Sequence, residues 1–540
     1  MKSFAGPPLC LDPGAMAAVD RAATVAGLPG AALMESAGRE TAREIRRRWP
    51  RPGRAGILVG GGNNGGDGLV VARYLVEAGW AVELRLFLDP DRLSGDAALQ
   101  WTLIEPMGLP RRMIREAGDP LDPTDATVLV DALLGTGLKG DVREPMRSAI
   151  LAVQAGSVPV VAVDTPSGLD GATGQVRGVA CRATVTVTYG FPKPGLLLAD
   201  GPAHVGRLVA VPLGYPPAAL EAAGPTPLCW TTLESARRAL PPRRHDDHKG
   251  DAGRLLVVAG SERFRGAVVL TAAAALRSGA GLCVVATPAP VSEFLLAQVP
   301  EAIVVALPVT KAGALATRSV DLVARAVEDA DAVAVGPGLT TGRHVRELVE
   351  AALAAPLPVV VDADGLNVLA RDPRPVRRDP ATILTPHPGE LGRWFGRDAF
   401  EVDAGRVDAA RYAARQHACR VILKGSPTVI AGPDGEACLN LTGNPGLATG
   451  GSGDVLTGVL GSLLAQGAPA ALADRAAPLL HGLAADWAAL DLGERGLVPS
   501  DLLRYVPLAI REVSAGRGAG LLDRLDHRYA ELLTATGERA

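Results

Sequence analysis

The chain has 540 residues, more than a single hydrophobic core usually supports, so its length predicts two or more domains. Apolar residues make up 48% of the sequence and the 55 basic residues nearly balance the 58 acidic ones, which argues against the strongly basic surface of a nucleic-acid-binding protein. The sequence has no apolar run of about 18 residues, and its N-terminus lacks the apolar core of a signal peptide, so we expect no membrane partner and a cytoplasmic location.

Cysteine and lysine usage add two expectations. The six cysteines are widely scattered and form no Cys-x-x-Cys pair, so the sequence predicts neither a zinc site nor a disulfide framework. Six of the 55 basic residues are lysines, which indicates that arginine serves wherever a plain positive charge is needed. Lys139, Lys249 and Lys424 are therefore candidates for a special role.

The first third of the chain alternates short β-branched runs with helical stretches. Near-continuous apolar runs of this kind are typical of parallel strands that helices cover on both faces. The sequence therefore predicts an open α/β layer fold. The expected strands are 55–60, 81–87, 126–135, 158–168 and 183–190.

The first of these strands leads into GGGNNGGDG, residues 60–68, and a helix is predicted directly after it, over 69–79. In open α/β sheets, ligands bind beyond the carboxyl ends of the strands, and glycines there let backbone N–H groups approach an anion. The stretch differs from a dinucleotide fingerprint because Asn63, Asn64 and Asp67 place polar side chains at its spacer positions. A tight strand-to-helix turn is the alternative.

Polar residues also follow the strands expected at 126–135 and 158–168. Because the carboxyl ends of parallel strands meet at one edge of a sheet, Asn64, Asp131 and Ser167 are expected to lie together as oxygen ligands of a cation. Hard oxygen donors favour an alkali or alkaline-earth ion over zinc. Each aspartate, taken alone, is also explained by a helix cap or a turn.

The motifs NNGGD, DALLGTGLKGD and VDTPSG, in that order, together resemble the NAD(P)H-hydrate epimerase domain over about residues 10–220. The resemblance implies a Rossmann-like fold that binds a potassium ion through Asn64, Asp131 and Ser167. It also implies that a hydrated dinucleotide binds to Asn63, Asn64, Gly65, Gly66, Asp67, Gly135, Thr136, Gly137, Leu138, Lys139, Gly140, Asp141 and Asp164.

The implied reaction interconverts the R and S forms of the hydrated coenzyme. It requires proton transfer to and from the hydroxyl oxygen at C6 of the nicotinamide ring, which a carboxylate and an ammonium group within hydrogen-bond reach can supply. We expect Asp164 to be this carboxylate and Lys139 the ammonium group. For Lys139, a simple phosphate contact is the alternative.

The alternating pattern lapses between about residues 213 and 251, where proline, alanine and charged residues prevail, so a domain boundary is predicted there. It then resumes with strands that end in motif-like loops, which predicts a second α/β domain. After about residue 513 the tail is rich in Gly, Arg and Glu and carries no recognisable chemistry. The expected domains are residues 1–225 and 226–515, followed by a tail, 516–540. The expected strands of the second domain are 254–260, 281–288, 331–338, 356–365, 381–390 and 420–425.

A second glycine-dense run, GNPGLATGGSGDVLTG, precedes apolar residues at helical spacing from Val455 onward. GGSGD is therefore expected at a helix N-terminus, where N–H groups and the helix dipole form an anion pocket; the run has no GK[ST] and is no P-loop. The negative charge of Asp454 would repel an anion bound there. However, its carboxylate is placed to take a proton from a hydroxyl that attacks a bound phosphoryl group. An ordinary first-turn aspartate is the alternative.

GGSGD in this setting resembles the ribokinase-like superfamily. The series HKGDAG, RGAVVL, GAGLCVVATP, VGPGL, DADGLN, TPHPGE, KGSPTVI and GNPGLATGGSGDVLTG resembles the ADP- or ATP-dependent NAD(P)H-hydrate dehydratase over about residues 230–512. The resemblance implies that Asp454 deprotonates the 6-hydroxyl so that it can be phosphorylated. It further implies that Ala267, Gly338, His387 and Asp454 line the hydrated nicotinamide site and that Lys424, Gly425, Ser426, Pro427, Thr428 and Gly453 contact the adenine nucleotide.

Together, the resemblances predict a bifunctional isomerase and lyase that repairs hydrated NADH and NADPH. Its expected partners are the small molecules NADHX and NADPHX, together with ADP or ATP and Mg²⁺. We expect the chain to form a homo-oligomer and to bind neither nucleic acid nor a membrane. One alternative is a kinase of the same superfamily that acts on a vitamin-precursor alcohol. Another is a first domain that binds nucleotide without catalysis, because a fold by itself does not determine function.

Overall fold

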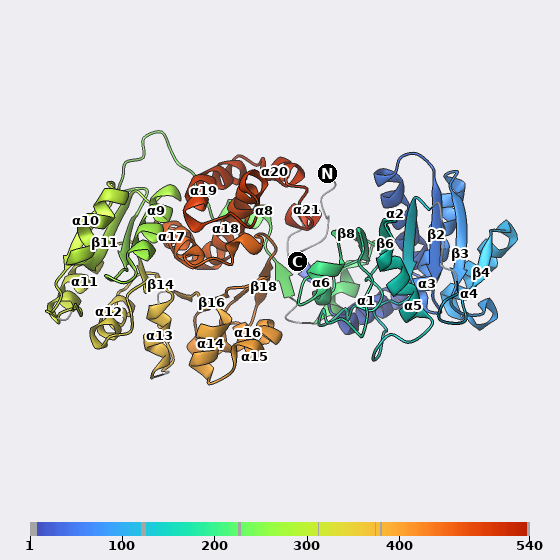
Figure 1. The fold of residues 1–540 in the computed structure, drawn as a ribbon, viewed down its shortest axis with the longest axis horizontal. Helices are drawn as coiled ribbons and strands as arrows, with labels where there is room; N and C mark the ends of the chain where they lie inside the picture. Colours follow the sequence, from blue (N-terminus) through green and yellow to red (C-terminus); the bar gives the residue numbers. More distant parts are fainter. Residues whose placement is uncertain are drawn as a thin grey trace. The chain divides into compact units, whose positions relative to one another are not determined.

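The computed structural model describes residues 8–119, 126–224, 228–311, 313–372, 374–378 and 381–536. The chain divides into two compact units, one formed by Met1–Leu228 together with His527–Ala540 and the other by Cys229–Asp526. The boundary predicted between residues 225 and 226 lies outside the described residues. Both units are α/β (Figure 1), which confirms the predicted fold class. Within the described ranges, no helix combines the length and the hydropathy that crossing a bilayer requires.

The N-terminal unit is built on a parallel sheet with the strand order β4-β3-β2-β5-β6-β7-β8. All five strands predicted for this part of the chain are present, and β4 and β8 extend the sheet at its two ends. The helices and strands of the unit are β1 (Leu9–Cys10), α1 (Pro13–Val25), α2 (Gly30–Arg48), β2 (Arg54–Val59), α3 (Asn63–Glu77), β3 (Ala81–Leu86), α4 (Gly95–Ile104), β4 (Arg111–Met113), β5 (Val128–Ala132), α5 (Met146–Ala155), β6 (Val160–Val163), β7 (Val185–Tyr189), α6 (Gly201–His204), β8 (Arg207–Val211), α7 (Pro217–Leu220) and α21 (Ala530–Leu533).

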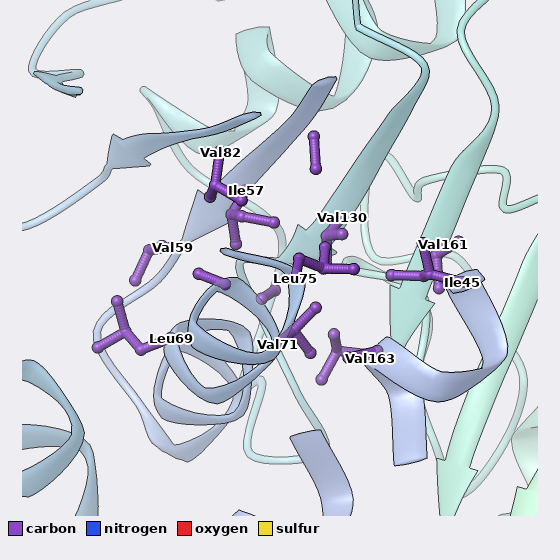
Figure 2. Close-up of a cluster of buried hydrophobic side chains, with 14 of the residues drawn as sticks. Ile45, Ile57, Val59, Leu69, Val71, Leu75, Val82, Val130, Val161 and Val163 are labelled. Carbon is purple, nitrogen blue, oxygen red and sulfur yellow. The ribbon is translucent and has the colours of Figure 1, made fainter. Parts of the chain in front are cut away.

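Apolar side chains alternate between the two faces of this sheet, as the geometry of a strand requires. Ile57 and Val59 of β2 belong to a buried cluster that includes Leu75 of α3 (Figure 2). Leu58, between them, belongs to a second cluster that includes Ile150 of α5. Helices thus cover both faces, which explains why the strands are near-continuous apolar runs in the sequence.

The C-terminal end of the chain packs within the N-terminal unit. The backbone N–H of Leu208, on the edge strand β8, donates a hydrogen bond to the carbonyl of Arg528 at 3.0 Å. The guanidinium of Arg528 donates to the carbonyl of Pro202, and Arg47 of α2 lies 3.5 Å from the carboxylate of Glu531. Residues 527–536, part of the tail to which the sequence assigned no role, therefore cover part of the edge of this sheet.

Deletion of residues 527–540 is expected to destabilise the N-terminal unit. Leu532 and Leu533 are fully buried, so their loss, with that of a partner for β8, costs about 3 kcal/mol or more. Hydrogen exchange measured by mass spectrometry should become faster in β8 and stay unchanged in the second unit. A chain that lacks only residues 537–540 is the control, and equal exchange of β8 in the two truncated chains would argue against this role.

The second unit contains a sheet with the order β9-β18-β17-β16-β15-β14-β13-β10-β11-β12. The strands from β10 to β16 pair in parallel, and β17 and β18 continue the sheet as antiparallel strands. All six strands predicted here are present; β9, β12, β17 and β18 were not predicted. The helices and strands are β9 (Leu228–Trp230), α8 (Leu233–Arg238), β10 (Arg254–Val258), α9 (Arg265–Arg277), β11 (Leu282–Pro288), α10 (Ala289–Gln298), β12 (Ile303–Leu307), α11 (Arg318–Glu328), β13 (Ala332–Val335), α12 (Arg343–Leu353), β14 (Val359–Val361), α13 (Asp364–Ala370), β15 (Thr382–Leu384), α14 (Pro388–Phe395), α15 (Ala399–Ala404), α16 (Arg406–His417), β16 (Arg420–Leu423), β17 (Thr428–Ala431), β18 (Ala437–Asn440), α17 (Ser452–Ala465), α18 (Ala470–Leu492), α19 (Pro499–Ser514) and α20 (Gly518–Arg524).

A disulfide joins Cys229 and Cys438 in this unit, a pair that the sequence did not predict when it indicated no disulfide framework. The two cysteines are 209 residues apart in the sequence, but their strands, β9 and β18, are neighbours in the sheet. Sequence spacing contains no information about such a pair, because only the fold brings the two strands together. The other four cysteines are free and buried.

Candidate active sites

The structure corrects the prediction of where the helix after the first glycine stretch begins. Helix α3 starts at Asn63 rather than at Leu69, so NNGGD forms the first turns of the helix and not a loop. The glycines permit close packing: a Cβ on Gly60 would lie 1.8 Å from the carbonyl oxygen of Leu133, and one on Gly65 would lie 1.9 Å from that of Gly60. These glycines therefore let α3 begin directly against the ends of β2 and β5.

Replacing Gly65 by alanine is expected to destabilise the N-terminal unit by about 3 kcal/mol, because the added methyl group meets a backbone carbonyl and the helix must shift. Gly62→Ala is the matched control, since nothing lies within 4 Å of a Cβ at that position. Urea denaturation followed by circular dichroism measures both variants. Similar midpoints for the two would show that Gly65 has no such packing role.

Two of the three residues predicted to bind a cation are in direct contact. The carboxylate of Asp131 accepts hydrogen bonds from the backbone N–H of Ser167 at 2.8 Å and from its hydroxyl at 2.5 Å. Both side chains are buried, and burial raises the pKa of Asp131. Asn64 is buried beside the same strand ends, with its amide next to Gly135. The described residues contain no group of three His, Cys, Asp or Glu side chains suited to a metal, but a buried carboxylate among neutral oxygens fits a monovalent cation.

The loop that follows β5 borders a cavity of about 270 Å³. Gly135, Thr136 and Leu138 line this cavity together with the start of α1 and residues 169–172. Of the other residues predicted to bind the dinucleotide, Gly65, Gly66 and Asp67 are buried in α3, whereas the exposed ones are Asn63, Gly137, Lys139, Gly140 and Asp141.

Asp164 follows β6 in the left-handed backbone region, with φ 60°. This conformation is costly for a residue with a side chain, and residues held in it are enriched at active sites. The Oδ1 atom of Asp164 accepts hydrogen bonds from the hydroxyl of Thr188 and the backbone N–H of Tyr189, each at 3.1 Å, and from the ammonium group of Lys193. Sequence reasoning missed Lys193, although the scarcity of lysine in the chain was a signal that could have found it.

Two further carboxyl groups lie near Asp164. Asp67 of α3 is buried, and burial together with the negative charge of Asp164 raises its pKa well above the usual range. Asp20 of α1 accepts a hydrogen bond from the hydroxyl of Tyr215 at 2.7 Å, and burial raises its pKa as well. Interacting ionisable groups of this kind at the ends of parallel strands are typical of an active site.

In the second unit, the ends of β14 and β16 meet the start of α17. The carboxylate of Asp362 accepts hydrogen bonds from the ammonium of Lys424 at 2.6 Å and from the hydroxyl of Thr457 at 2.7 Å. A Cβ on Gly453 would lie 3.3 Å from the ammonium nitrogen of Lys424. Helix α17 begins at Ser452, which confirms the predicted position of GGSGD. Asp362 and Thr457 lie in two of the motifs that the sequence singled out, but no role was assigned to either residue.

Asp454 lies in the first turn of α17 and is partly exposed. Burial and the negative charge of Asp362 raise its pKa to about 7; Asp364 and Glu390 act in the same direction, while Lys424 opposes them. A carboxyl group that titrates near neutrality is suited to accept a proton at physiological pH. Asp454 therefore has the electrostatic setting of a general base.

The remaining residues predicted for this site lie just beyond strand ends or, for Ala267, in the first turn of α9. Gly338 and Ala267 are in contact, since a Cβ on Gly338 would lie 2.9 Å from that of Ala267. His387 is half-exposed and caps α14, where its Nδ1 accepts a hydrogen bond from the N–H of Gly389 at 3.0 Å. Burial, followed by the positive charge of Lys424, lowers the pKa of His387 to about 4, so it is neutral at pH 7. The segment from β16 into β17 consists of Gly425, Ser426, Pro427 and Thr428.

Comparison with known proteins identifies both units. Residues 30–195 match the family described as YjeF-related protein N-terminus, and residues 255–508 match NAD(P)H-hydrate dehydratase. A crystal structure of the ADP/ATP-dependent NAD(P)H-hydrate dehydratase from Bacillus subtilis, co-crystallised with ATP and Mg²⁺, is 33% identical and covers 53% of this chain and 98% of that chain, with a TM-score of 0.47.

Full-length relatives match nearly the whole chain. The bifunctional NAD(P)H-hydrate repair enzyme of Moorella thermoacetica is 38% identical over 497 residues, which cover 90% of this chain and 93% of the relative. That of Thermofilum pendens is 40% identical over 485 residues, 89% of this chain and 91% of the relative. The chain therefore belongs to the family of bifunctional NAD(P)H-hydrate repair enzymes.

Proposed function

We propose that the chain repairs hydrated NADH and NADPH in two reactions. Its N-terminal unit interconverts the R and S forms, and its second unit dehydrates the S form with ADP or ATP as phosphoryl donor. The observation that carries the proposal is Asp454, a carboxyl group with a pKa of about 7 at the start of α17, close to Lys424 and Gly453. The helix start offers N–H groups and a positive dipole end to a phosphate, beside a base for the attacking hydroxyl.

Phosphorylation would turn the 6-hydroxyl into a good leaving group. The hydroxyl gives its proton to Asp454 while its oxygen attacks the terminal phosphorus of the nucleotide, and the bond from that phosphorus to the rest of the nucleotide breaks. The electron pair of the ring nitrogen then expels phosphate, and the neighbouring carbon loses a proton, which regenerates the reduced nicotinamide. Mg²⁺, held by the phosphates, would balance their charge.

The other residues of the second unit would hold the two substrates. Ala267, Gly338 and His387 would line the hydrated nicotinamide, and the contact between Ala267 and Gly338 supports one shared site for them. The neutral state of His387 at pH 7 leaves its exposed ring free to hydrogen-bond without adding charge. The segment 424–428 would contact the adenine nucleotide.

In the N-terminal unit, we assign to Asp164 the transfer of the proton to and from the 6-hydroxyl, and to residues 63–67 and 135–141 the binding of the dinucleotide. Potassium would be held by Asn64, Asp131 and Ser167, where it would neutralise a buried carboxylate. The contact between Asp131 and Ser167 supports this assignment. We propose that the chain binds these small molecules and no other partner. We also propose that it forms a homo-oligomer in the cytoplasm, and light scattering would measure the mass of this oligomer.

The direct test supplies the purified chain with the S form of hydrated NADH, Mg²⁺ and either ADP or ATP, and follows the absorbance of the reduced nicotinamide. We expect recovery that depends on the nucleotide, and recovery from the R form faster than its spontaneous epimerisation. A stable phosphate ester without recovery of the absorbance would contradict dehydration and favour a small-molecule kinase. Recovery from the S form alone would contradict the epimerase.

Replacing Lys424 by methionine is expected to move the pH dependence of dehydration to higher pH. The reaction needs the carboxylate of Asp454, so its rate should rise with pH through the pKa of about 7. The positive charge of Lys424 lowers that pKa, and removing the charge therefore raises it. The measurement is kcat at saturating substrates across the neutral range, with the exposed Lys311→Met as control. An unchanged profile would disprove this coupling.

A further inference from the structure

Lys193 is a buried cation to which the proposed reaction assigns no role. Its side chain is 2% exposed. Its ammonium group donates hydrogen bonds to the hydroxyl of Thr188 at 3.2 Å, to the carbonyl of Tyr189 at 3.1 Å and to the carboxylate of Asp164. An ammonium group has three N–H donors, so all three are used and the orientation of the side chain is determined.

The two carboxylate oxygens of Asp164 have unequal surroundings. Oδ1 accepts three hydrogen bonds, from Thr188, Tyr189 and Lys193. Oδ2 accepts none from the residues that the structure describes, and the side chain is 14% exposed. One oxygen is therefore held by the protein, and the other is available to a ligand.

Lys139, the ammonium group predicted from the sequence, lies in different surroundings. It is exposed in the loop after β5, and within the described ranges it forms no hydrogen bond or ion pair. A group that assists proton transfer must lie within hydrogen-bond reach of its partner. Of these two lysines, only Lys193 contacts Asp164.

The charges around Lys193 also favour a role for this cation. Asp164, Asp67 and Asp20 interact electrostatically with one another and with Lys193. Neighbouring carboxylates repel, which disfavours two negative charges at one site. A fixed ammonium in contact with Asp164 stabilises negative charge at the carboxylate that must accept the proton.

We propose that Lys193, rather than Lys139, is the positioning residue of the epimerase site: it holds Oδ1 of Asp164 and stabilises the carboxylate, so that Oδ2 exchanges the proton with the 6-hydroxyl of the hydrated coenzyme. The inference rests on the proposed epimerase activity. As Oδ2 takes the proton from the hydroxyl, the C6–O bond becomes a carbonyl and the C6–N1 bond breaks, with its electron pair going to the ring nitrogen. The nitrogen then adds to the other face of the C6 carbonyl, and the oxygen regains its proton from Oδ2. Lys193 keeps its three protons throughout.

Variants of the full chain at Lys193 test the proposal, with consumption of the R form as the epimerase assay and dehydration of the S form as the internal control. Lys193→Met is expected to lower kcat for epimerisation by about 100-fold. KM should change by less than about threefold, because the lysine acts on the proton-transfer step and not on binding. Lys193→Arg, which restores the positive charge, should have a kcat at least about tenfold higher than that of Lys193→Met. Lys311→Met, an exposed lysine outside both sites, is the control and should keep kcat within about threefold, and Lys139→Met should lower kcat far less than Lys193→Met does.

Three results would overturn the role of Lys193 and leave the epimerase intact. The first is a nearly normal kcat in the Lys193→Met chain. The second is a loss of kcat in Lys139→Met as large as that in Lys193→Met. The third is an equal loss of kcat in Lys193→Met and Lys193→Arg while hydrogen exchange stays unchanged. If Lys193→Met unfolds the N-terminal unit, Thr188→Val decides. The variant removes a hydroxyl that contacts both the ammonium of Lys193 and Oδ1 of Asp164, which should lower kcat about tenfold, and an unchanged kcat overturns the proposal. Conversion of the R form by the wild-type chain at no more than the spontaneous rate would instead overturn the proposed epimerase itself.

Discussion

Replacing Asp454 by asparagine is expected to lower kcat for dehydration of the S form by about 1,000-fold, while epimerisation of the R form continues. Asparagine has nearly the same shape but cannot accept the proton of the 6-hydroxyl, so the oxygen attacks the phosphoryl group as a poor nucleophile. The raised pKa of about 7 makes Asp454 an effective base, because it titrates near the pH of the reaction. Recovery of the reduced nicotinamide from the S form with saturating ADP or ATP measures the loss.

Asp321→Asn is the matched control for this change, because it removes the same charge from an exposed position in the first turn of α11. The control should keep kcat within about twofold of the wild-type chain. An Asp454→Asn chain with more than about a tenth of the wild-type kcat would disprove a general-base role. Loss of epimerisation in the same variant would indicate instead that the change had disrupted the chain more widely.

Replacing Asp164 by asparagine is expected to lower kcat for conversion of the R form by about 100-fold or more and to leave dehydration of the S form unchanged. Asparagine is preferred to alanine here because it tolerates the left-handed backbone at φ 60° better than other side chains do. It retains hydrogen-bonding atoms for Thr188 and Tyr189 but cannot exchange the proton. R-form consumption, corrected for spontaneous epimerisation, is the measurement.

The control for this second change is Asp91→Asn, an exposed aspartate of the same unit. It should leave both reactions unchanged. Equal use of the two epimers by the Asp164→Asn chain would rule out Asp164 as the proton-transfer group. Loss of both reactions together would point to misfolding rather than to chemistry.

Two of the missed strands, β4 and β12, differ from the predicted strands in their burial. The predicted strands all lie inside their sheets, and several are fully buried, as are β5 and β13; a buried run of this kind has few other stable places in a soluble protein. Both β4 and β12 are edge strands with exposed residues: β4 begins with two exposed arginines, and the apolar run IVVAL of β12 is exposed at two of its five positions. Short, half-exposed strands are stabilised by the neighbour they pair with, so their own sequence predicts them poorly.

The two glycine-dense stretches were located correctly, but the reason for the first was only partly foreseen. The sequence predicted glycines that expose backbone N–H groups to an anion. The structure adds that Gly60 and Gly65 lie against backbone carbonyls, where a side chain has no room. The helix therefore starts at Asn63, several residues earlier than its apolar pattern indicated. A close approach between segments cannot be inferred from the glycines of one segment alone.

By itself, the sequence determined the α/β class of both units, the strand ends that bear polar motifs, the helix start at GGSGD and the family. These properties depend on local hydrophobic patterns and short motifs, which are written in consecutive residues. Only the tertiary structure decided that Lys193 contacts Asp164, that Asp362 joins Lys424 to Thr457, and that the C-terminal tail packs against β8. Such contacts join residues far apart in the chain, and no local pattern encodes which distant side chain the folded protein brings into hydrogen-bond range.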